Sequence, residues 1–382
     1  METLAMEERA THRWIDTKTG LDDLLRVLED RRSLALDSES NSGFAYQERL
    51  CLLQINDGTE VWLLDLLALP GGNQALEPIR PMLEDPDYEI QLHGGEFDVG
   101  CLKRDYGITL AGLWDSQQAA SFLGWPKTGY GAVVEEVCGV SLPKAHTRHD
   151  WSSRPVTGPE LQYAISDVRY LPRVAAGLKS DVRAADLEEE VLIACAAVEK
   201  ATWNGGFRPE ALWSIKGVRQ LAAKEKGVLM ALYRWRETVA RELDMPAGKT
   251  INNELLMALA RSSPARPEQL KRLGVPRRVT TRWASDLLGV IAEAQRVPPE
   301  LPAQPSRQPL DRQVQKRGDR LKKWRRGEAD RRGVPMQAVL PVAALKHLQQ
   351  WGGEDLESVP QLGAKRIRLY GATLVQLTAS QP

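Results

Sequence analysis

The chain has 382 residues, of which 42% are hydrophobic and 27% are charged, with equal numbers of acidic and basic side chains. This composition is ordinary for a globular protein of two or three domains, and no run of about 18 apolar residues predicts a membrane span. The N-terminus, METLAMEERATHRW, lacks the apolar segment of a secretory signal, so we expect a cytoplasmic protein.

The zero net charge hides two halves of opposite sign. Residues 1–206 hold 19 Lys and Arg against 34 Asp and Glu, a net charge of −15, whereas residues 207–382 hold 32 against 17, a net charge of +15. A basic half of this size indicates contact with a polyanion such as a nucleic acid. The two halves could also simply attract each other.

Cysteine spacing bears on metal binding and on the redox compartment. The chain contains four cysteines, which are far apart and form no CxxC pair: Cys51, Cys101, Cys138 and Cys195. This spacing favours free, buried thiols over a zinc site or a disulfide framework.

The acidic half begins with a helix and a strand. Leucine spacing in residues 20–31 predicts the helix, and SLALDSES (33–40) predicts a strand that ends in two carboxylates. Successive side chains of a strand point to opposite faces, so Asp37 and Glu39 project from the same face. Because they repel each other, they bring no structural advantage and are candidates for half of a divalent-metal site. A polar strand end is the simpler alternative.

Further strands and helices follow in alternation. Residues 49–56 and 60–66 predict two strands joined by the Asn-Asp-Gly turn at 56–58, which is typical of a hairpin. The sheet is therefore expected to contain adjacent antiparallel strands. Residues 73–84 then predict a helix, and 88–94 another strand.

The next helix begins after the glycine pair in HGG. Phe97, Leu102 and Tyr106 predict its apolar stripe, and Asp98 falls in its first turn. An acidic side chain at that position often only complements the helix dipole. Asp115, further along, is expected to cap a helix.

The segment KAHTRHDWSSRP predicts a polar loop, in which His146 and His149 are expected to be solvated or to lie on the substrate side. The stretch TGPELQYAISDVRYL then predicts a helix that begins near its Thr-Gly-Pro. Tyr163 and Asp167 are four residues apart, one helical turn, and so share a face of this helix.

Taken together, the carboxylate-bearing segments resemble the three motifs of the DEDDy 3′–5′ exonucleases: DSE on a strand, HGGEFD at a helix start and YAISD on a later helix. The surrounding text is similar to that of the ribonuclease D family, in LDSES, LCLLQINDG, HGGEFDVGCLKRDYG, LWDSQQAA, DWSSRP and LQYAISDVRYL. The resemblance spans nearly all of residues 14–180. It implies an α/β exonuclease domain with a ribonuclease H-like mixed sheet flanked by helices.

The resemblance also implies a catalytic set of four carboxylates and one tyrosine. These residues are Asp37, Glu39, Asp98, Tyr163 and Asp167. The carboxylates are hard oxygen ligands that suit two divalent metal ions, Mg²⁺ or Mn²⁺, clamping the attacking and leaving oxygens of a phosphodiester displacement. The tyrosine would orient the attacking water, directly or as a weak base.

The implied activity is metal-dependent 3′–5′ exoribonuclease action that releases nucleoside 5′-monophosphates. The implied substrate is RNA, in particular tRNA precursors, and we expect a monomer with no membrane contact and no obligate protein partner. Ser40 departs from the family pattern, because relatives commonly carry Phe there, beside the terminal base. This departure leaves the 3′-end nucleotide preference open.

The basic half contains an internal repeat at an offset of 89 residues. LYRWRETVARELDMP (232–246) aligns with LKKWRRGEADRRGVP (321–335), so Trp235 matches Trp324 and Pro246 matches Pro335. Each copy predicts a small all-helical bundle, and the first copy resembles an HRDC domain. We expect the two tryptophans to pack in the bundle cores rather than to stack on bases.

These patterns divide the chain into four parts. They are a DEDDy exonuclease domain (1–206), an HRDC domain (207–296), a Pro-rich linker (297–310) and a second HRDC-like helical domain (311–382). The strongly basic run RQVQKRGDRLKKWRRGEADRR in the last part is expected to contact phosphates, although such runs also occur on solvated helix faces.

Three alternatives stay open at this point. A 3′–5′ DNA exonuclease would use the same fold and ligands, and no residue pattern here reads a 2′-hydroxyl. A non-catalytic nucleic-acid-binding adaptor usually lacks one of the carboxylates, and all four are present in this chain. An RNA-binding scaffold in a degradation assembly would depend on the HRDC-like repeats alone.

Overall fold

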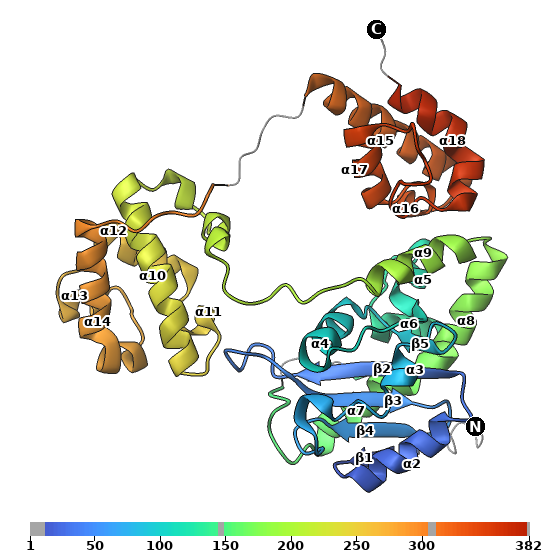
Figure 1. Cartoon of the computed structure of the whole chain (residues 1–382), viewed down its shortest axis with the longest axis horizontal. Coiled ribbons are helices and arrows are strands. Elements are labelled where there is room, and N and C mark those ends of the chain that lie inside the picture. Colours follow the sequence, from blue (N-terminus) through green and yellow to red (C-terminus); the bar gives the residue numbers. More distant parts are fainter. Residues whose placement is uncertain (1–11, 144–148, 305–310, 380–382) are drawn as a thin grey trace. The chain divides into compact units, whose positions relative to one another are not determined.

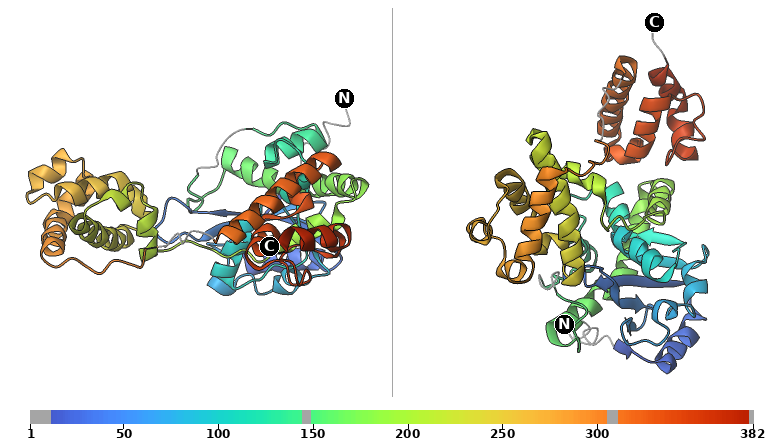
Figure 2. Two further views of the ribbon diagram at one scale, coloured as in Figure 1. Left: turned by 90° about the horizontal axis from the view of Figure 1, so that it is seen from above. Right: turned by 60° about the vertical axis from the view of Figure 1, so that its left-hand side comes forward.

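Figures 1 and 2 show the computed structural model of the chain, which describes residues 12–143, 149–304 and 311–379. The chain divides into two compact units. The first comprises Met1–Ser40, Leu50–Trp203 and Pro309–Pro382, and the second comprises Asn41–Arg49 and Asn204–Gln308. Within the described ranges, no helix is long and apolar enough to cross a membrane.

The first unit contains a mixed sheet, as the family resemblance implied, and this sheet has six strands. In order across the sheet, the strands are β1 (His12–Ile15), β4 (Val61–Asp65), β3 (Leu50–Asn56), β2 (Ser33–Ser40), β5 (Glu89–Leu92) and β6 (Leu113–Asp115). β3 pairs antiparallel with both β2 and β4, which confirms the predicted hairpin. The remaining pairs, β1 with β4, β2 with β5 and β5 with β6, are parallel.

Helices cover both faces of this sheet. They are α2 (Lys18–Leu28), α3 (Arg80–Leu83), α4 (Glu96–Tyr106), α5 (Ser116–Phe122), α6 (Tyr130–Cys138), α7 (Gly158–Arg169), α8 (Leu171–Ala184) and α9 (Glu188–Val198). Leu34 and Leu36 of β2 pack in a core that includes Leu102 of α4. Ile165 of α7 packs with Leu63 in a separate core on the opposite face. Alternation along β2 therefore places Asp37 and Glu39 on the α7 face.

Two sequence predictions in this region are wrong. Residues 73–84 do not form one helix, but a 3₁₀ turn, η1 (Gly72–Gln74), and the short α3. The prolines at positions 78 and 81 interrupt the segment, because proline lacks the N–H that a continuous helix needs. Phe97 is 45% exposed rather than buried. Asp98, Cys101 and Leu102 share the buried side of α4 at i, i+3 and i+4, and this register turns Phe97 toward solvent.

In the loop before α7, residues 144–148, with His146, lie outside the described residues, and His149 is half-buried with its ring 5.0 Å from that of Trp151. Trp151 is 2% exposed and packs in the core beneath α7. Arg154 forms an ion pair with Asp65 at 2.7 Å and donates to the Cys51 carbonyl at 2.9 Å. The four cysteines match the prediction: none of them forms a disulfide, and all but Cys138 are buried.

The second unit holds the first helical bundle. Its helices are α10 (Ala223–Glu242), α11 (Ala247–Thr250), α12 (Asn253–Ser262), α13 (Pro267–Arg272) and α14 (Arg277–Arg296), preceded by the 3₁₀ turns η2 (Pro209–Ser214) and η3 (Val218–Gln220). Trp235 is 7% exposed in the bundle core, and its Nε1 donates to Asp286 at 2.5 Å. The loop Asn41–Arg49 belongs to this unit because Tyr46 binds α10, its hydroxyl donating to Glu237 at 2.8 Å.

The second bundle belongs to the first unit and repeats the first bundle. It contains α15 (Arg312–Arg332), α16 (Met336–Val339), α17 (Val342–Trp351) and α18 (Ala364–Thr378). Both ends of α16 and of α17 keep the 89-residue offset from α11 and α12. Pro246 and Pro335 stand directly before equivalent helices. Trp324 is partly buried against Tyr370, with ring centroids 5.2 Å apart, so packing rather than stacking on bases accounts for both tryptophans.

A buried lysine joins this second bundle to α9 within the first unit. The Lys365 ammonium lies 3.2 Å from the Glu190 carboxylate and 3.0 Å from that of Asp186. Glu190 is only 1% exposed, and removal of one partner from a buried ion pair is strongly destabilising. A second contact is the hydrogen bond from Gln337 to the Ser121 hydroxyl at 2.6 Å.

Candidate active site

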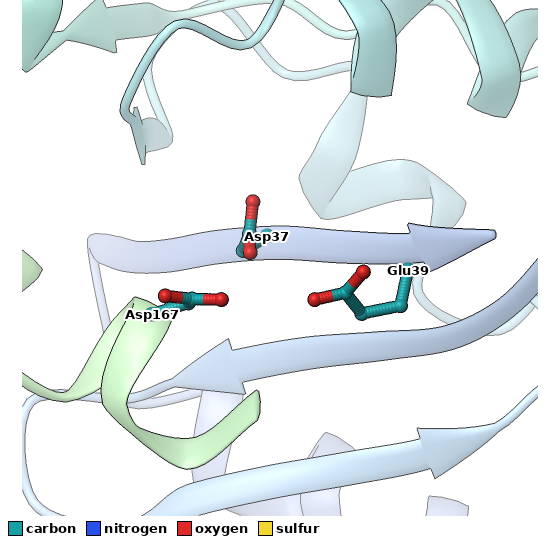
Figure 3. Close-up of side chains that lie close together, drawn as sticks. All are labelled: Asp37, Glu39 and Asp167. Carbon is teal, nitrogen blue, oxygen red and sulfur yellow. The ribbon is translucent and has the colours of Figure 1, made fainter. Parts of the chain in front are cut away.

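Three of the predicted carboxylates converge on the α7 face of the sheet. Asp37 and Glu39 project from β2 and Asp167 from α7, and their carboxylate oxygens lie within 4.8 Å of one another (Figure 3). The register of β2 against β3 shifts directly after Glu39, between that residue and Ser40. Such a bulge changes the direction of the side chains beside it, and it ends regular pairing at the edge of this cluster.

Asp98 lies close to these three but is held differently. It is 7% exposed in the first turn of α4, and it accepts a hydrogen bond from the hydroxyl of Ser38. Ser38 stands between Asp37 and Glu39 on β2 and points to the opposite face. The carboxylate of Asp98 is thus outside the group of three, although its negative charge raises their pKa values.

Burial and mutual repulsion raise the pKa of every carboxyl in this cluster. Loss of hydration is the largest cause at each position, followed at Asp37 and Glu39 by the charges of the neighbouring carboxylates. The pKa of Asp37 is raised well above its ordinary value, that of Glu39 to about 9 and that of Asp167 to about 7. The cluster therefore favours positive charge, supplied by protons or by a cation.

Tyr163 is bonded to the cluster, as its spacing from Asp167 suggested. The tyrosine hydroxyl forms a hydrogen bond with the Asp167 carboxylate, which partly offsets the raised pKa of that acid. Burial, and then the charges of Asp167 and Glu39, raise the pKa of Tyr163 itself. The phenol thus stays protonated at neutral pH and acts as a hydrogen-bond donor. Its ring lies 6.1 Å from that of Trp151.

The sequence did not reveal how α7 is held. Asn56 was assigned only to the hairpin turn, but its side-chain amide donates to the carbonyls of Val168 at 3.0 Å and Arg169 at 3.1 Å. These are the last residues of α7, directly after Asp167. Asn56 therefore ties the carboxylate-bearing end of α7 to β3. An Asn beside a turn gives no local signal of such a distant partner.

Asp115 also does more than its predicted task. It caps α5 by accepting a hydrogen bond from the backbone N–H of Gln117 at 2.8 Å, as expected. Its two carboxylate oxygens also accept from the backbone N–H groups of Gly94 and Gly95, each at 3.0 Å. This second pair of bonds fixes the turn that leads into α4, and so fixes the position of Asp98.

A second tyrosine lies near the cluster without any signal in the sequence. The hydroxyl of Tyr130, at the start of α6, donates to the Ser166 carbonyl at 3.2 Å. Burial raises the pKa of Tyr130, and the charges of Asp167 and Asp37 raise it further. Its phenol is therefore also protonated at neutral pH.

Comparison with known protein families agrees with the two kinds of architecture seen here. Residues 12–183 match the model of a 3′–5′ exonuclease domain. Residues 225–291 and 315–378 each match the model of the HRDC domain. The two HRDC matches cover the two helical bundles.

Several curated relatives share most of the chain. Ribonuclease D of Cronobacter turicensis is 31% identical over 282 residues, covering 74% of this chain and 75% of the relative. Ribonuclease D of Escherichia coli is 30% identical over 296 residues, covering 77% and 78%. The crystal structure of the Escherichia coli enzyme, described as an exoribonuclease involved in structured RNA processing, superposes with a TM-score of 0.70 at 26% identity, covering 96% of this chain and 98% of that one.

The matched family models extend over the exonuclease sheet and both bundles, and the identity to the curated relatives shows common descent rather than a shared fold alone. The chain belongs to the ribonuclease D family and is a hydrolytic 3′–5′ exoribonuclease.

Proposed function

We propose that this protein trims the 3′ ends of structured RNA, in particular tRNA precursors, and releases nucleoside 5′-monophosphates with the help of two divalent metal ions. The observation that carries the proposal is the convergence of Asp37, Glu39 and Asp167 oxygens within 4.8 Å. The relative in Escherichia coli, described as acting in structured RNA processing, supports the substrate class. The domain limits 1–206, 207–296 and 311–382 are part of the same proposal.

The side chains of the cluster fit divalent cations. Carboxylate oxygens are the ligands that Mg²⁺ and Mn²⁺ prefer. The raised pKa values of Glu39 and Asp167 indicate a site that lacks compensating positive charge. Asp37, Glu39 and Asp167 would hold the ions, with Asp98 as a fourth ligand after release of its bond to Ser38. When bound, two such ions supply Lewis-acid stabilisation of the attacking and leaving oxygens.

Tyr163 would hold the attacking water in line with the terminal phosphodiester. Because the phenol is protonated in the metal-free site, it can donate its hydrogen bond to the water oxygen. Asp167, one turn along α7, accepts the single phenolic hydrogen bond in the structure, and the tyrosine would transfer this bond to the water oxygen when the water binds.

The exposed basic side chains of α15 are proposed to bind RNA phosphates. The sequence suggested that the whole basic run could do so, but some of its side chains bind backbone carbonyls instead. Arg320 donates to the Leu377 carbonyl at 2.9 Å, and Arg325 to that of Met336 at 3.0 Å. Several other basic side chains of the helix are exposed: Arg312, Lys316, Lys322, Lys323 and Arg326. These exposed side chains are the candidates for phosphate contact.

Substitution of a cluster carboxylate should abolish hydrolysis and leave the fold intact. We expect Asp37→Asn and Asp167→Asn each to retain less than about a tenth of wild-type activity, because a two-ion site requires every ligand. Release of nucleotides from 3′-labelled RNA and DNA oligomers, with Mg²⁺ or with EDTA, measures the effect. Circular dichroism controls for folding. Substantial activity in either variant would contradict the assignment, and equal rates on DNA would broaden the substrate class.

The metal-free protein should lose stability as the pH rises. The raised pKa values of Asp167, to about 7, and of Glu39, to about 9, mean that the native state binds protons that the unfolded chain has already released. The free energy of unfolding should therefore fall from about pH 5 to about pH 9. Thermal unfolding in EDTA across this pH range should show that the free energy of unfolding decreases. Added Mg²⁺ should make this decrease smaller, and Asp167→Asn should make the dependence on pH flatter. If the free energy of unfolding of Asp167→Asn decreased with pH as steeply as that of the wild type, the raised pKa of Asp167 would not be the cause.

Tyr163→Phe should lower kcat about 10- to 100-fold with little change in KM, because the hydroxyl acts on the water in the transition state. Single-turnover hydrolysis and RNA binding are measured side by side. Gln162→Ala, an exposed neighbour on α7, is the control. An unchanged kcat in the phenylalanine variant would leave Tyr163 as a packing residue only.

Neutralising the exposed cations of α15 should weaken RNA capture. We expect the triple variant Lys322→Gln, Lys323→Gln, Arg326→Gln to make the slope of log affinity against log salt shallower by about 2. Turnover of short oligomers should stay unchanged. The charge-preserving swap Lys322→Arg, Lys323→Arg, Arg326→Lys serves as the control. Identical slopes for all three proteins on a tRNA-sized RNA would show that this helix face does not contact the substrate.

A further inference from the structure

A glutamine lies beside the carboxylate cluster without a defined task. Gln54, in the middle of β3, pairs with Asp37 on β2 and with Leu63 on β4. Directly opposed residues of antiparallel strands point to the same face, with Cβ atoms about 4.5–5.5 Å apart. Gln54 is therefore a neighbour of Asp37 on the sheet face that α7 covers.

The side chain of Gln54 is fully enclosed and unpaired. It is 0% exposed, and neither its amide nitrogen nor its amide oxygen has a hydrogen-bond partner among the described residues. Its neighbours on this face, Leu52 and Leu63, belong to the apolar core beneath α7. A buried, unpaired amide destabilises a fold, and an apolar side chain would suit these surroundings better. The stability of the fold therefore gives no reason for a glutamine here.

Chemistry at the adjacent carboxylate does give a reason. An amide offers two N–H donors that never titrate, and hydrogen bonds to an ionised carboxylate are stronger than those to a neutral acid. A carboxylate that ligates a metal keeps free lone pairs, and a neighbouring donor to them fixes its orientation. Gln54 is placed for this task, since Asp37 is its direct cross-strand partner.

We propose that Gln54 is a positioning residue of the metal site, whose amide nitrogen donates to the Asp37 carboxylate when that carboxylate holds a divalent cation. The proposal rests on the proposed metal-dependent function. In the metal-free state the unpaired amide of Gln54 destabilises the fold. Its hydrogen bond to Asp37 would form only when a divalent cation is bound. Gln54 does not touch the reacting atoms, so it acts through Asp37 alone.

The test is Gln54→Met in the full-length protein, a substitution that keeps side-chain length and removes both polar groups. Gln91→Met is the matched control. Gln91 is 7% exposed on β5, pairs with Ala35 of β2 rather than with a carboxylate of the cluster, and its amide nitrogen already donates to Glu89 at 2.8 Å. Calorimetric titration with Mn²⁺ without RNA measures metal affinity directly, and thermal unfolding in EDTA measures the stability of the metal-free state.

We expect Gln54→Met to weaken Mn²⁺ binding about 10- to 100-fold, to lower kcat without raising KM for RNA, and to leave the metal-free protein as stable as the wild type or more so. Gln91→Met should keep the wild-type affinity. Equal affinity in Gln54→Met and the wild type overturns the proposal, as does an equal loss in both variants. A wild type that binds no Mn²⁺ overturns the metal site as well. Gln54→Leu repeats the measurement should the methionine variant not fold.

Discussion

Carboxylates held close together repel one another, and the first unit has to oppose that repulsion with its backbone. Asp37 and Glu39 cannot separate without disturbing β2, which is bonded on one side to β3 and on the other to β5. Asp167 is held by α7, and the last carbonyls of this helix accept hydrogen bonds from the side-chain amide of Asn56. The geometry of the cluster therefore depends on hydrogen bonds between elements far apart in the sequence.

Because the backbone holds the carboxylates close together, the site lowers the stability of the metal-free fold. The raised pKa values show that the native state prefers protonated carboxyls, and the unpaired amide of Gln54 adds a second unfavourable group. Functional sites commonly depart in this way from what stability alone would select. The large apolar cores on both faces of the sheet offset these local costs.

Much of this architecture could be predicted from local patterns. The alternation in SLALDSES placed Asp37 and Glu39 on one face, and four-residue spacing placed Tyr163 beside Asp167. The 89-residue repeat predicted equivalent helices in the two bundles, and α12 and α17 keep that offset. These predictions succeeded because strand and helix periods are local patterns, and because an internal repeat can be found by comparing the sequence with itself.

Contacts between distant segments were beyond such patterns. The bond of Ser38 to Asp98 and the second task of Asp115 depend on which elements meet in space. Phe97 was misplaced because an apolar residue in a first turn follows whichever register its helix adopts against the sheet. Counting charges likewise overstated the basic surface, since Arg320 and Arg325 bind backbone carbonyls.

The contact of Lys365 with α9 has a consequence for how the chain tolerates cleavage. Segment 204–308 of the second unit is inserted in the chain between two parts of the first unit, one before it and one after it. A single protease cut in the Pro-rich linker would leave the first bundle joined to α9 by the peptide chain. The second bundle would stay in contact with α9 and the residues before it through the ion pairs of Lys365 with Glu190 and Asp186. A nicked molecule would thus keep all its parts under native conditions, and the damage would show only on a denaturing gel.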